Sequence, residues 1–317
     1  MRGKGRYVTI EGKCILVLGG TGFLGSSLLE PLLCRGCQVR VYSRGGQPEH
    51  PVLGVEYLTG DISDRNRLRQ ALAGAKLVAH FADATLPQTA EDDPLATLSA
   101  NLDAAFNILT LCAAGGVERL LYCSSGGTVY GIPQTLPILE NAVPAPISSY
   151  GLTKYVIENA IRYFGFKHGL DYVICRPSNI YGPGQSPFRQ QGIIAVAMLK
   201  TLRQEAITVF GDGSVIRDYL YIDDLTDFFL RCLGGGPGNV TVNVGSGRGY
   251  AVNEVLELIR KVSGQPLAVE CLAVRSFDVP ANYLDIDLAN RLYGWKPRVG
   301  LEEGLRLTFA AFKKRFA

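Results

Sequence analysis

The feature that most constrains the fold is a glycine-rich turn between a short apolar segment and a helical pattern. Residues 14–18 (CILVL) are typical of a buried strand, and a helix is expected to open at Ser26. Glycines in this setting let the backbone turn sharply and approach a pyrophosphate at the helix N-terminus. The spacing is GxxGxxG, and it predicts a dinucleotide-binding loop. The residues expected to contact the dinucleotide here are Gly19, Gly22, Phe23, Leu24 and Gly25.

Apolar segments alternate with helical patterns along the first half of the chain. This alternation predicts an α/β protein with a doubly wound parallel Rossmann sheet. Beyond residue 175 the alternation loosens, which predicts a dinucleotide-binding domain at 1–175 and a smaller C-terminal α/β substrate domain at 176–317. The Pro- and Gly-rich stretch 176–184 is expected to be a loop. Strands are expected at 14–18, 38–42, 55–58, 75–81, 118–123 and 171–175, and helices at 94–114 and 150–166.

Ligands of such sheets bind beyond the carboxyl ends of the strands. Asp61 follows the third strand and is a candidate acceptor for an adenine amino group, whereas Asp64 is expected to cap the helix beginning near Arg65. His80 is interpreted as a packed core histidine. The other residues at this rim that we expect to contact a cofactor are Ile62, Phe81, Ala82, Ser124 and Pro177.

The second strand ends in Ser43 and Arg44. An Asp or Glu at this position usually binds the ribose hydroxyls and selects NAD. A serine and an arginine suit a 2′-phosphate, which favours NADP, but an arginine here also stacks on adenine or faces solvent without selecting a phosphate. NAD and NADP therefore both stay open as the cofactor.

Tyr150 and Lys154 lie four residues apart at the start of an expected helix, so they share one face. A nearby ammonium favours the phenolate, so we expect the pKa of Tyr150 to fall towards the working pH and the phenol to act as a general acid and base. The alternative is an ordinary solvated helix face. The glycine turn and the strand order favour the functional interpretation.

Composition argues against several other functions. A formal net charge of +3 over 317 residues argues against a nucleic-acid-binding surface. We find no apolar run of about 18 residues and no secretion signal, so we expect no membrane span. Eight scattered cysteines, only three histidines and a lone CxxC at Cys34 and Cys37 argue against a metal site. A reducing, cytoplasmic location is expected.

Together these segments resemble the extended short-chain dehydrogenase/reductase family, in particular the 4-epimerases of its nucleotide-sugar epimerase/dehydratase branch. The matching segments occur in family order over nearly the whole chain. They are residues 19–25, 60–64, 80–82, 124–131, 176–184, 211–213, 217–219 and 243–247, with Tyr150, Lys154, Arg275 and Asp278.

The resemblance implies a nucleotide-sugar 4-epimerase that acts on a UDP-hexose. Tyr150 would take the proton of the C4 hydroxyl, the C4 hydride would move to the nicotinamide, and the 4-keto sugar would receive it back on its other face. Lys154 would hold the nicotinamide ribose. Asn179, Arg217 and Arg275 would hold the nucleotide diphosphate, since guanidinium groups suit phosphate oxygens.

The resemblance also concerns assembly and domain structure. Members of the family dimerise through helices that match 94–114 and 150–166, which implies a homodimer. The segment near 208–235 is expected to pack back on the first domain. The alternative for Arg217 and Arg275 is a surface ion pair with Asp218 or Asp278.

One position departs from the family pattern. The 4-epimerases usually carry a Ser or Thr hydroxyl where this chain has Gly126, so either Ser125 or Thr128 is the candidate for the third catalytic group. The dehydratases place an Asp-Glu pair next in this loop, where this chain has Gly127 and Thr128, which argues against water elimination.

Two other functions stay open on the sequence. One is an NADPH-dependent reductase of a nucleotide-linked keto sugar, which Ser43 and Arg44 favour. The other is a non-catalytic, cofactor-binding regulatory module, against which the Tyr150/Lys154 pair weighs.

Overall fold

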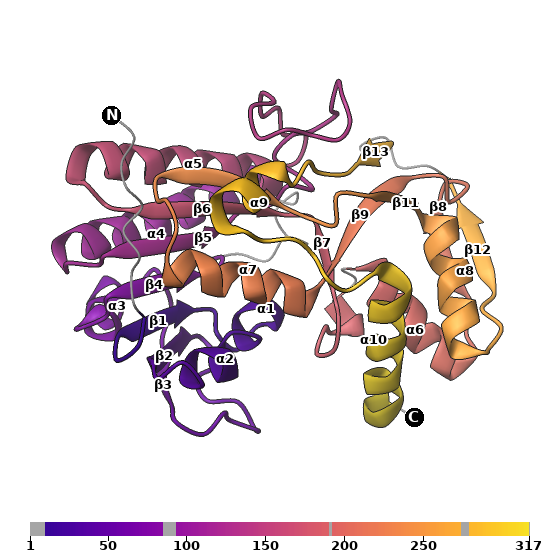
Figure 1. Ribbon diagram of the computed structural model, residues 1–317, viewed down its shortest axis with the longest axis horizontal. Coiled ribbons are helices and arrows are strands. Elements are labelled where there is room, and N and C mark those ends of the chain that lie inside the picture. The colour runs from indigo at the N-terminus through magenta and orange to yellow at the C-terminus, as the bar shows by residue number, and fades with distance from the viewer. Residues whose placement is uncertain (1–9, 85–92, 190–191, 274–278, 317) are drawn as a thin grey trace.

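A computed structural model describes residues 10–84, 93–189, 192–273 and 279–316, and its larger part is built on a seven-stranded sheet (Figure 1). The strands are β1 Cys14–Leu18, β2 Gln38–Ser43, β3 Val55–Thr59, β4 Leu77–His80, β5 Arg119–Cys123, β6 Tyr172–Pro177 and β10 Val240–Val244. Their order is β10-β6-β5-β4-β1-β2-β3, and each neighbouring pair is parallel. The predicted Rossmann sheet is confirmed.

Helices cover both faces of this sheet because successive strand residues point in opposite directions. Leu16 and Leu18 are buried on one face of β1, and Ile15 and Val17 on the other. The helices of the first face are α3 Arg65–Leu72, α4 Pro94–Ala114 and α5 Ser149–His168. Those of the second face are α2 Leu29–Leu33, α7 Ile222–Gly234 and α9 Asp287–Tyr293.

A smaller part lies beside the sheet, on the right in Figure 1. Its helices are α6 Ile193–Arg203, α8 Val252–Ser263 and α10 Leu301–Phe316. Its strands are β7 Asn179–Tyr181, β8 Ile207–Phe210, β9 Ile216–Tyr221, β11 Gly249–Ala251, β12 Val269–Leu272 and β13 Ala281–Asn282. They form the sheet β11-β9-β13, with β7 paired to β9, and the separate pair β12-β8. Met198, Leu256 and Leu305 are buried in the core of this part.

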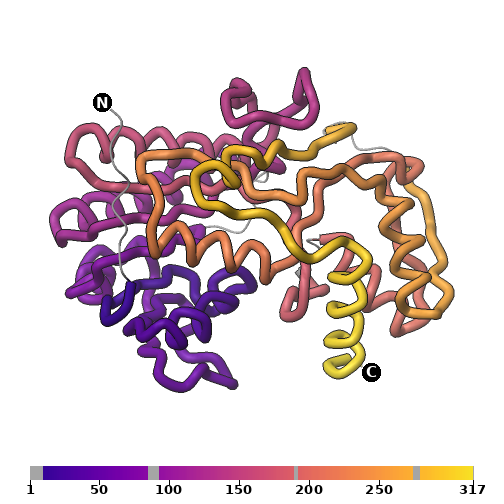
Figure 2. The backbone as a smooth tube through the Cα atoms, viewed as in Figure 1, coloured from indigo at the N-terminus to yellow at the C-terminus, as the bar shows by residue number. Residues whose placement is uncertain are grey.

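The chain passes between the two parts more than once, as the tube in Figure 2 shows. After β9 it returns to the large sheet, where Phe228 and Phe229 of α7 are fully buried against the second face. Strand β10 then pairs with β6 at the edge of that sheet. The boundary at residue 175 and the substrate-domain role of 176–317 stay predictions.

Two local predictions are wrong. The loop predicted at 176–184 is largely strand, because β6 extends to Pro177 and β7 pairs with β9, a partner about 40 residues further on that local Pro and Gly signals do not reveal. The helix predicted to open at Ser26 begins at Phe23, as α1 Phe23–Ser26, and is interrupted before α2. Pro31 has no amide hydrogen to donate one turn back, so a continuous helix would lose a bond there.

Helix α4 is 21 residues long and apolar enough, by length and composition alone, to cross a membrane. In the structure Ala104, Ile108 and Cys112 of α4 are buried in the first-face core, and α4 packs against α3 and α5. This packing accounts for the apolar character of the helix. The dimer through α4 and α5 and the cytoplasmic location stay predictions.

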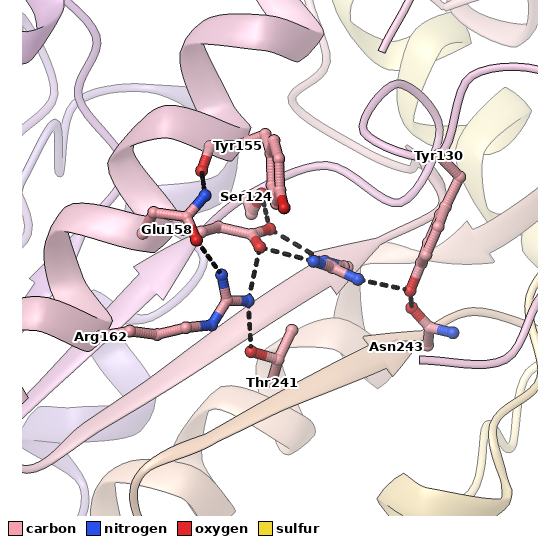
Figure 3. A network of polar contacts seen from close by, with 9 residues as sticks. Ser124, Tyr130, Tyr155, Glu158, Arg162, Thr241 and Asn243 are labelled. Atoms are coloured by element: carbon pink, nitrogen blue, oxygen red, sulfur yellow. Dashed lines mark hydrogen bonds and ion pairs between the residues drawn. The ribbon is translucent and has the colours of Figure 1, made fainter. Parts of the chain in front are cut away.

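A buried ion pair fastens α5 to the sheet. Glu158 of α5 is fully buried and accepts hydrogen bonds from Nε and Nη2 of Arg176 on β6, at 2.9 and 2.6 Å. Its carboxylate also accepts from Ser124 Oγ at 2.6 Å and from Arg162 at 2.8 Å (Figure 3). Burial acts to raise the pKa of Glu158, but Arg176, together with Ser124 and Arg162, outweighs it, so the pKa is lowered.

The same network continues to β10. Arg176 Nη1 donates to the hydroxyl of Tyr130 at 2.9 Å. That hydroxyl donates to Asn243 Oδ1 at 2.7 Å (Figure 3). Asn243 Nδ2 in turn donates to the carbonyl of Ile138. One connected set of polar groups therefore holds α5, the end of β6, β10 and the 130–138 segment together.

Removing Arg176 would leave Glu158 as an uncompensated buried carboxylate. We expect Arg176→Met to lower the free energy of unfolding by about 3–5 kcal/mol, measured by chemical denaturation. Lys13→Met is the matched control, because Lys13 pairs with Glu118 at a half-buried site and its loss should cost less than about 1 kcal/mol. Equal losses in the two variants would contradict the structural role of the buried pair.

Candidate functional site

A cleft of about 820 Å³ borders the carboxyl ends of the strands. It is lined by residues that follow β1 through β6, so it spans the place between β1 and β4 where the strand order reverses. That is where open α/β sheets bind ligands, and the volume is that of a ligand site. The cleft brings together these residues predicted from the sequence: Gly19, Gly22, Phe23, Leu24, Gly25, Ser43, Arg44, Ile62, Phe81, Ala82, Ser124, Ser125, Thr128, Tyr150, Lys154, Pro177 and Asn179.

Several lining residues carry no role in the sequence analysis. Asp83 follows β4 at the predicted rim, but nothing local marks its function. Gln185 and Gly192 come from the segment after β7, which reaches the cleft only because β7 pairs with β9. The others are Thr21, Tyr42, Gly45, Gly60, Cys123, Ser148, Ser178 and Ile180.

At two positions of the glycine turn, neighbouring backbone atoms leave no room for a side chain. Gly19 has φ +79°, and a Cβ there would lie 3.0 Å from the amide nitrogen of Ala82. A Cβ on Gly25 would lie 2.5 Å from the carbonyl oxygen of Gly19. Because these positions carry no side chain, the backbone of the turn is exposed to the cleft. Such a backbone surface is suited to a dinucleotide pyrophosphate.

Ser43 and Arg44, the residues predicted to select the cofactor, both line the cleft. Arg44 Nη1 donates to the carbonyl of Ala84 at 3.2 Å, and Ser43 Oγ to that of Gly46 at 3.4 Å. Asp61 is not among the described lining residues, although its neighbours Gly60 and Ile62 are. Its carboxylate accepts from Ser63, whose amide hydrogen bond is the main cause of a lowered Asp61 pKa.

Helix α5 places the predicted acid/base pair at the cleft. Ser148 caps the helix, with its Oγ accepting from the Gly151 amide at 3.1 Å, so that Tyr150 lies in the first turn and Lys154 one turn later. Lys154 is buried, and its Nζ donates to Asp83 Oδ1 at 2.8 Å and to the Cys123 carbonyl at 3.2 Å. The Nζ atom lies 5.4 Å from the centroid of the Tyr150 ring.

The pKa predicted for Tyr150 is wrong for the ligand-free protein. Burial raises the pKa of Tyr150 to about 12, and the lowering effect of Lys154 is smaller. The nearby carboxylate of Asp83 acts in the same direction as burial. The i,i+4 spacing reveals that an ammonium lies near Tyr150, but it reveals neither the burial of the phenol nor the carboxylate of Asp83.

Gly126, where the family resemblance leads one to expect a hydroxyl, has no room for a side chain. A Cβ on Gly126 would lie 2.7 Å from Leu284 Cδ1 and 2.9 Å from the Arg176 carbonyl. Both alternatives, Ser125 and Thr128, line the cleft. Among the described residues, Thr128 Oγ1 is buried and has no hydrogen-bond partner.

Thr128 also lies against the start of α5. A Cβ on Gly151, the residue after Tyr150, would lie 2.6 Å from the Thr128 carbonyl. The loop after β5 and the first turn of α5 are therefore in close contact. Ser124, by contrast, commits its hydroxyl to Glu158.

The predicted substrate-binding residues have different settings. Asn179 lines the cleft, and its Nδ2 donates to the Asp218 carbonyl at 3.1 Å. Arg217 donates to the carbonyls of Ile216 and Val279 and is not among the described lining residues. Asp218 is fully buried and accepts from Ser246 and Leu284, so its carboxylate is not at the surface. Arg275 and Asp278 lie outside the described residues.

His80 is a core residue, as predicted. It is buried with its ring centroid 5.3 Å from that of Tyr122, and burial lowers its pKa to about 4. Asp64 caps α3 as predicted, accepting from the amides of Asn66 and Arg67. Within the described ranges, no three His, Cys, Asp or Glu side chains are grouped so as to hold a metal ion.

Comparison with known proteins agrees with this geometry. The sequence model of the NAD dependent epimerase/dehydratase family matches residues 15–245. A putative UDP-glucose 4-epimerase of Methanocaldococcus jannaschii is 32% identical over 92% of this chain and 96% of its own length.

Two solved structures are similar along nearly their whole length. The UDP-glucose 4-epimerase of Thermotoga maritima, crystallised with UDP-glucose, has a TM-score of 0.91 and 32% identity, covering 96% of this chain and 100% of that one. The UDP-glucose 4-epimerase of Thermus thermophilus, in complex with NAD, has a TM-score of 0.88 and 31% identity, covering 95% and 99%. The chain therefore belongs to the NAD dependent epimerase/dehydratase family, a branch of the extended short-chain dehydrogenases/reductases, and is an enzyme of that family.

Proposed function

We propose that this enzyme is a nucleotide-sugar 4-epimerase that acts on a UDP-hexose with NAD. The observation that carries the proposal is the convergence of Tyr150 and Lys154 on the cleft that the glycine turn borders. An acid/base tyrosine beside a dinucleotide loop is what the reversible oxidation of an alcohol requires. The similar enzymes crystallised with UDP-glucose and with NAD support this choice of substrate and cofactor.

NAD, when bound, would supply a hydride acceptor that can also return the hydride, which would allow the sugar carbon C4 to pass through a ketone. Tyr150 accepts the proton of the C4 hydroxyl and returns it after the sugar has turned its other face. Lys154 holds a positive charge beside the phenolate. The glycine turn with Phe81 and Ala82 would hold the dinucleotide, and Ser43 and Arg44 would contact its adenosine.

Thr128 is the better candidate for the third catalytic group. Its hydroxyl is buried without a partner, whereas water or a ligand normally satisfies such a group. It lies in the loop that contacts the start of α5, next to Tyr150. Thr128 therefore donates to, or accepts from, the substrate oxygen whose proton Tyr150 takes.

Asn179 is proposed to contact the nucleotide diphosphate from the cleft wall. For Arg217 and Arg275 the same role rests on guanidinium chemistry and on the family resemblance. Gly127 and Thr128 stand where dehydratases carry their Asp-Glu pair, so the site lacks carboxylates for water elimination there.

One observation favours a second candidate, an NADPH-dependent reductase of a nucleotide-linked keto sugar. Arg44 lines the cleft at the end of β2 and is the only guanidinium among the described lining residues. A guanidinium there suits a 2′-phosphate.

A direct test incubates the protein as purified with UDP-, dTDP-, GDP- and CDP-sugars and monitors the conversion of each sugar by NMR. We expect UDP-hexoses that differ at C4 to interconvert with no net change in nicotinamide absorbance, and NAD to be the bound cofactor by mass. Tyr150→Phe should lower the rate by roughly 10²–10⁴-fold, since it removes the acid/base group. Stoichiometric consumption of NADPH would favour the reductase, and full activity of Tyr150→Phe would count against Tyr150 as the base.

The choice of hydroxyl is tested by Thr128→Val, which keeps the shape of the side chain, with Ser125→Ala as its matched control. Losing a hydrogen bond to a developing charge costs about 1.5–3 kcal/mol, so kcat should fall by roughly 10- to 150-fold in Thr128→Val. Ser125→Ala should stay within about threefold of wild type, below the cost of one such bond. The reverse pattern would assign the role to Ser125.

Cofactor selection is tested by measuring the Kd of NAD and NADP calorimetrically. We expect NAD to bind more tightly than NADP. Arg44→Gln should raise the Kd of NADP by about tenfold or more, because a charge-assisted hydrogen bond is lost, while the Kd of NAD should change little. Arg67→Gln, an exposed arginine on α3, is the control. Tighter binding of NADP by wild type would contradict the assignment of NAD.

A further inference from the structure

The ammonium of Lys154 has an acidic partner that the family resemblance does not assign. Asp83 Oδ1 lies 2.8 Å from Lys154 Nζ, and the two side chains are 21% and 4% exposed. Nζ also donates to the neutral carbonyl of Cys123, and a hydrogen bond from Lys154 lowers the pKa of Tyr150. Because a buried ammonium is costly without an opposite charge, Asp83 contributes directly to keeping Lys154 charged.

This ion pair joins two walls of the cleft. Asp83 belongs to the segment after β4, whose Ala82 amide lies against Gly19 of the glycine turn. Lys154 comes from α5, one turn after Tyr150. Asp83 and Lys154 both line the cleft, so the pair lies between the dinucleotide loop and the acid/base tyrosine.

Two opposite charges therefore act on the Tyr150 phenol. Lys154 lowers the pKa of Tyr150, and Asp83 raises it. A carboxylate beside an ammonium offsets much of its field at a third group.

Among the described residues, the other titratable groups around the pair do not add a charge that upsets this balance. His80 faces it from β4, and burial lowers the pKa of His80 to about 4. Tyr122 and Cys123 face it from β5, and burial raises the pKa of both, that of Cys123 to about 12. These three groups are neutral near pH 7. Glu158 of α5 is charged but is paired with Arg176.

We propose that Asp83 is a positioning residue that sets the proton affinity of Tyr150, by anchoring the Lys154 ammonium and offsetting its charge. The proposal rests on the proposed role of Tyr150 as the general base. Burial is the main reason that Tyr150 stays a phenol, and Asp83 adds to it by offsetting the charge of Lys154. Removing the carboxylate of Asp83 lets the charge of Lys154 act more fully on Tyr150.

The test is a pH titration of the ligand-free protein by NMR with tyrosine labelled at Cζ. The Tyr150 signal is assigned by its absence in Tyr150→Phe, and circular dichroism shows the highest pH at which the fold persists. In Asp83→Asn we expect Tyr150 to ionise at a pH lower by about one unit or more, as for the loss of one nearby charge. Asp83→Glu should titrate close to wild type.

Asp171→Asn is the matched control. Asp171 lies 2.8 Å from the buried Arg119, and the two side chains are 29% and 2% exposed, as in the Asp83–Lys154 pair. Arg119 begins β5, whereas Cys123 beside Lys154 ends it. Asp171→Asn should leave the Tyr150 titration unchanged. An unchanged or higher ionisation pH in Asp83→Asn, or an equal shift in Asp171→Asn, would overturn the proposal.

A second pair of variants covers the case in which Asp83→Asn does not fold. Lys154→Met and Lys154→Met/Asp83→Asn leave no unpaired buried ammonium, and loss of both partners is better tolerated than loss of one. Tyr150 should again ionise at the lower pH in the variant without Asp83. The same ionisation pH in both would overturn the proposal.

Activity gives an independent readout. In Asp83→Asn the alkaline rise of kcat/KM for the UDP-hexose should begin about one pH unit lower than in wild type, because the phenolate forms earlier. If no nucleotide sugar is turned over, the proposed function fails while the NMR titration still decides the role of Asp83. If turnover is found but the Tyr150 titration does not move, the role of Asp83 alone fails.

Discussion

The arrangement of the site depends on the buried ion pair between Glu158 and Arg176. A buried carboxylate is stable only when its charge is matched and its oxygens accept hydrogen bonds, and Arg176 with Ser124 meets both needs. Arg176 lies near the end of β6, and Ser124 follows β5. Glu158 lies one turn after Lys154 on α5. Satisfying one buried charge thus fixes the helix that carries the proposed acid/base pair to the strand ends that border the cleft.

The second constraint is close backbone contact. A side chain on Gly25 would collide with the Gly19 carbonyl, and one on Gly151 would collide with the Thr128 carbonyl. Glycine is therefore required at one position in each wall of the cleft. Gly126 follows the same rule, since Leu284 and the Arg176 carbonyl occupy the space of its missing Cβ. The usual position for a catalytic hydroxyl is therefore closed by packing, and the buried, unpartnered hydroxyl lies two residues later, on Thr128.

The electrostatics of the pair follow from this enclosure. Lys154 is close to Tyr150, yet burial raises the pKa of Tyr150 to about 12 and Asp83 adds to that effect. Proximity to an ammonium is not sufficient to form a phenolate when water is excluded and a carboxylate shares the ammonium. The spacing of Tyr150 and Lys154 alone therefore does not set the protonation state of the tyrosine.

Periodicity, turn residues and caps act over a few residues. The sequence by itself therefore determined six of the seven strands of the large sheet, the glycine turn, the cap of α3 and the helix that carries Tyr150 and Lys154. Because ligands of such sheets bind beyond the carboxyl ends of the strands, most of the predicted cofactor-binding residues were expected near one another, and they line one cleft. The tertiary structure decided the strand pairing of β7 with β9, the partners of Glu158 and the pairing of Lys154 with Asp83, 71 residues away. These depend on which distant groups meet and on how much water they exclude, and neither quantity is encoded in local spacing.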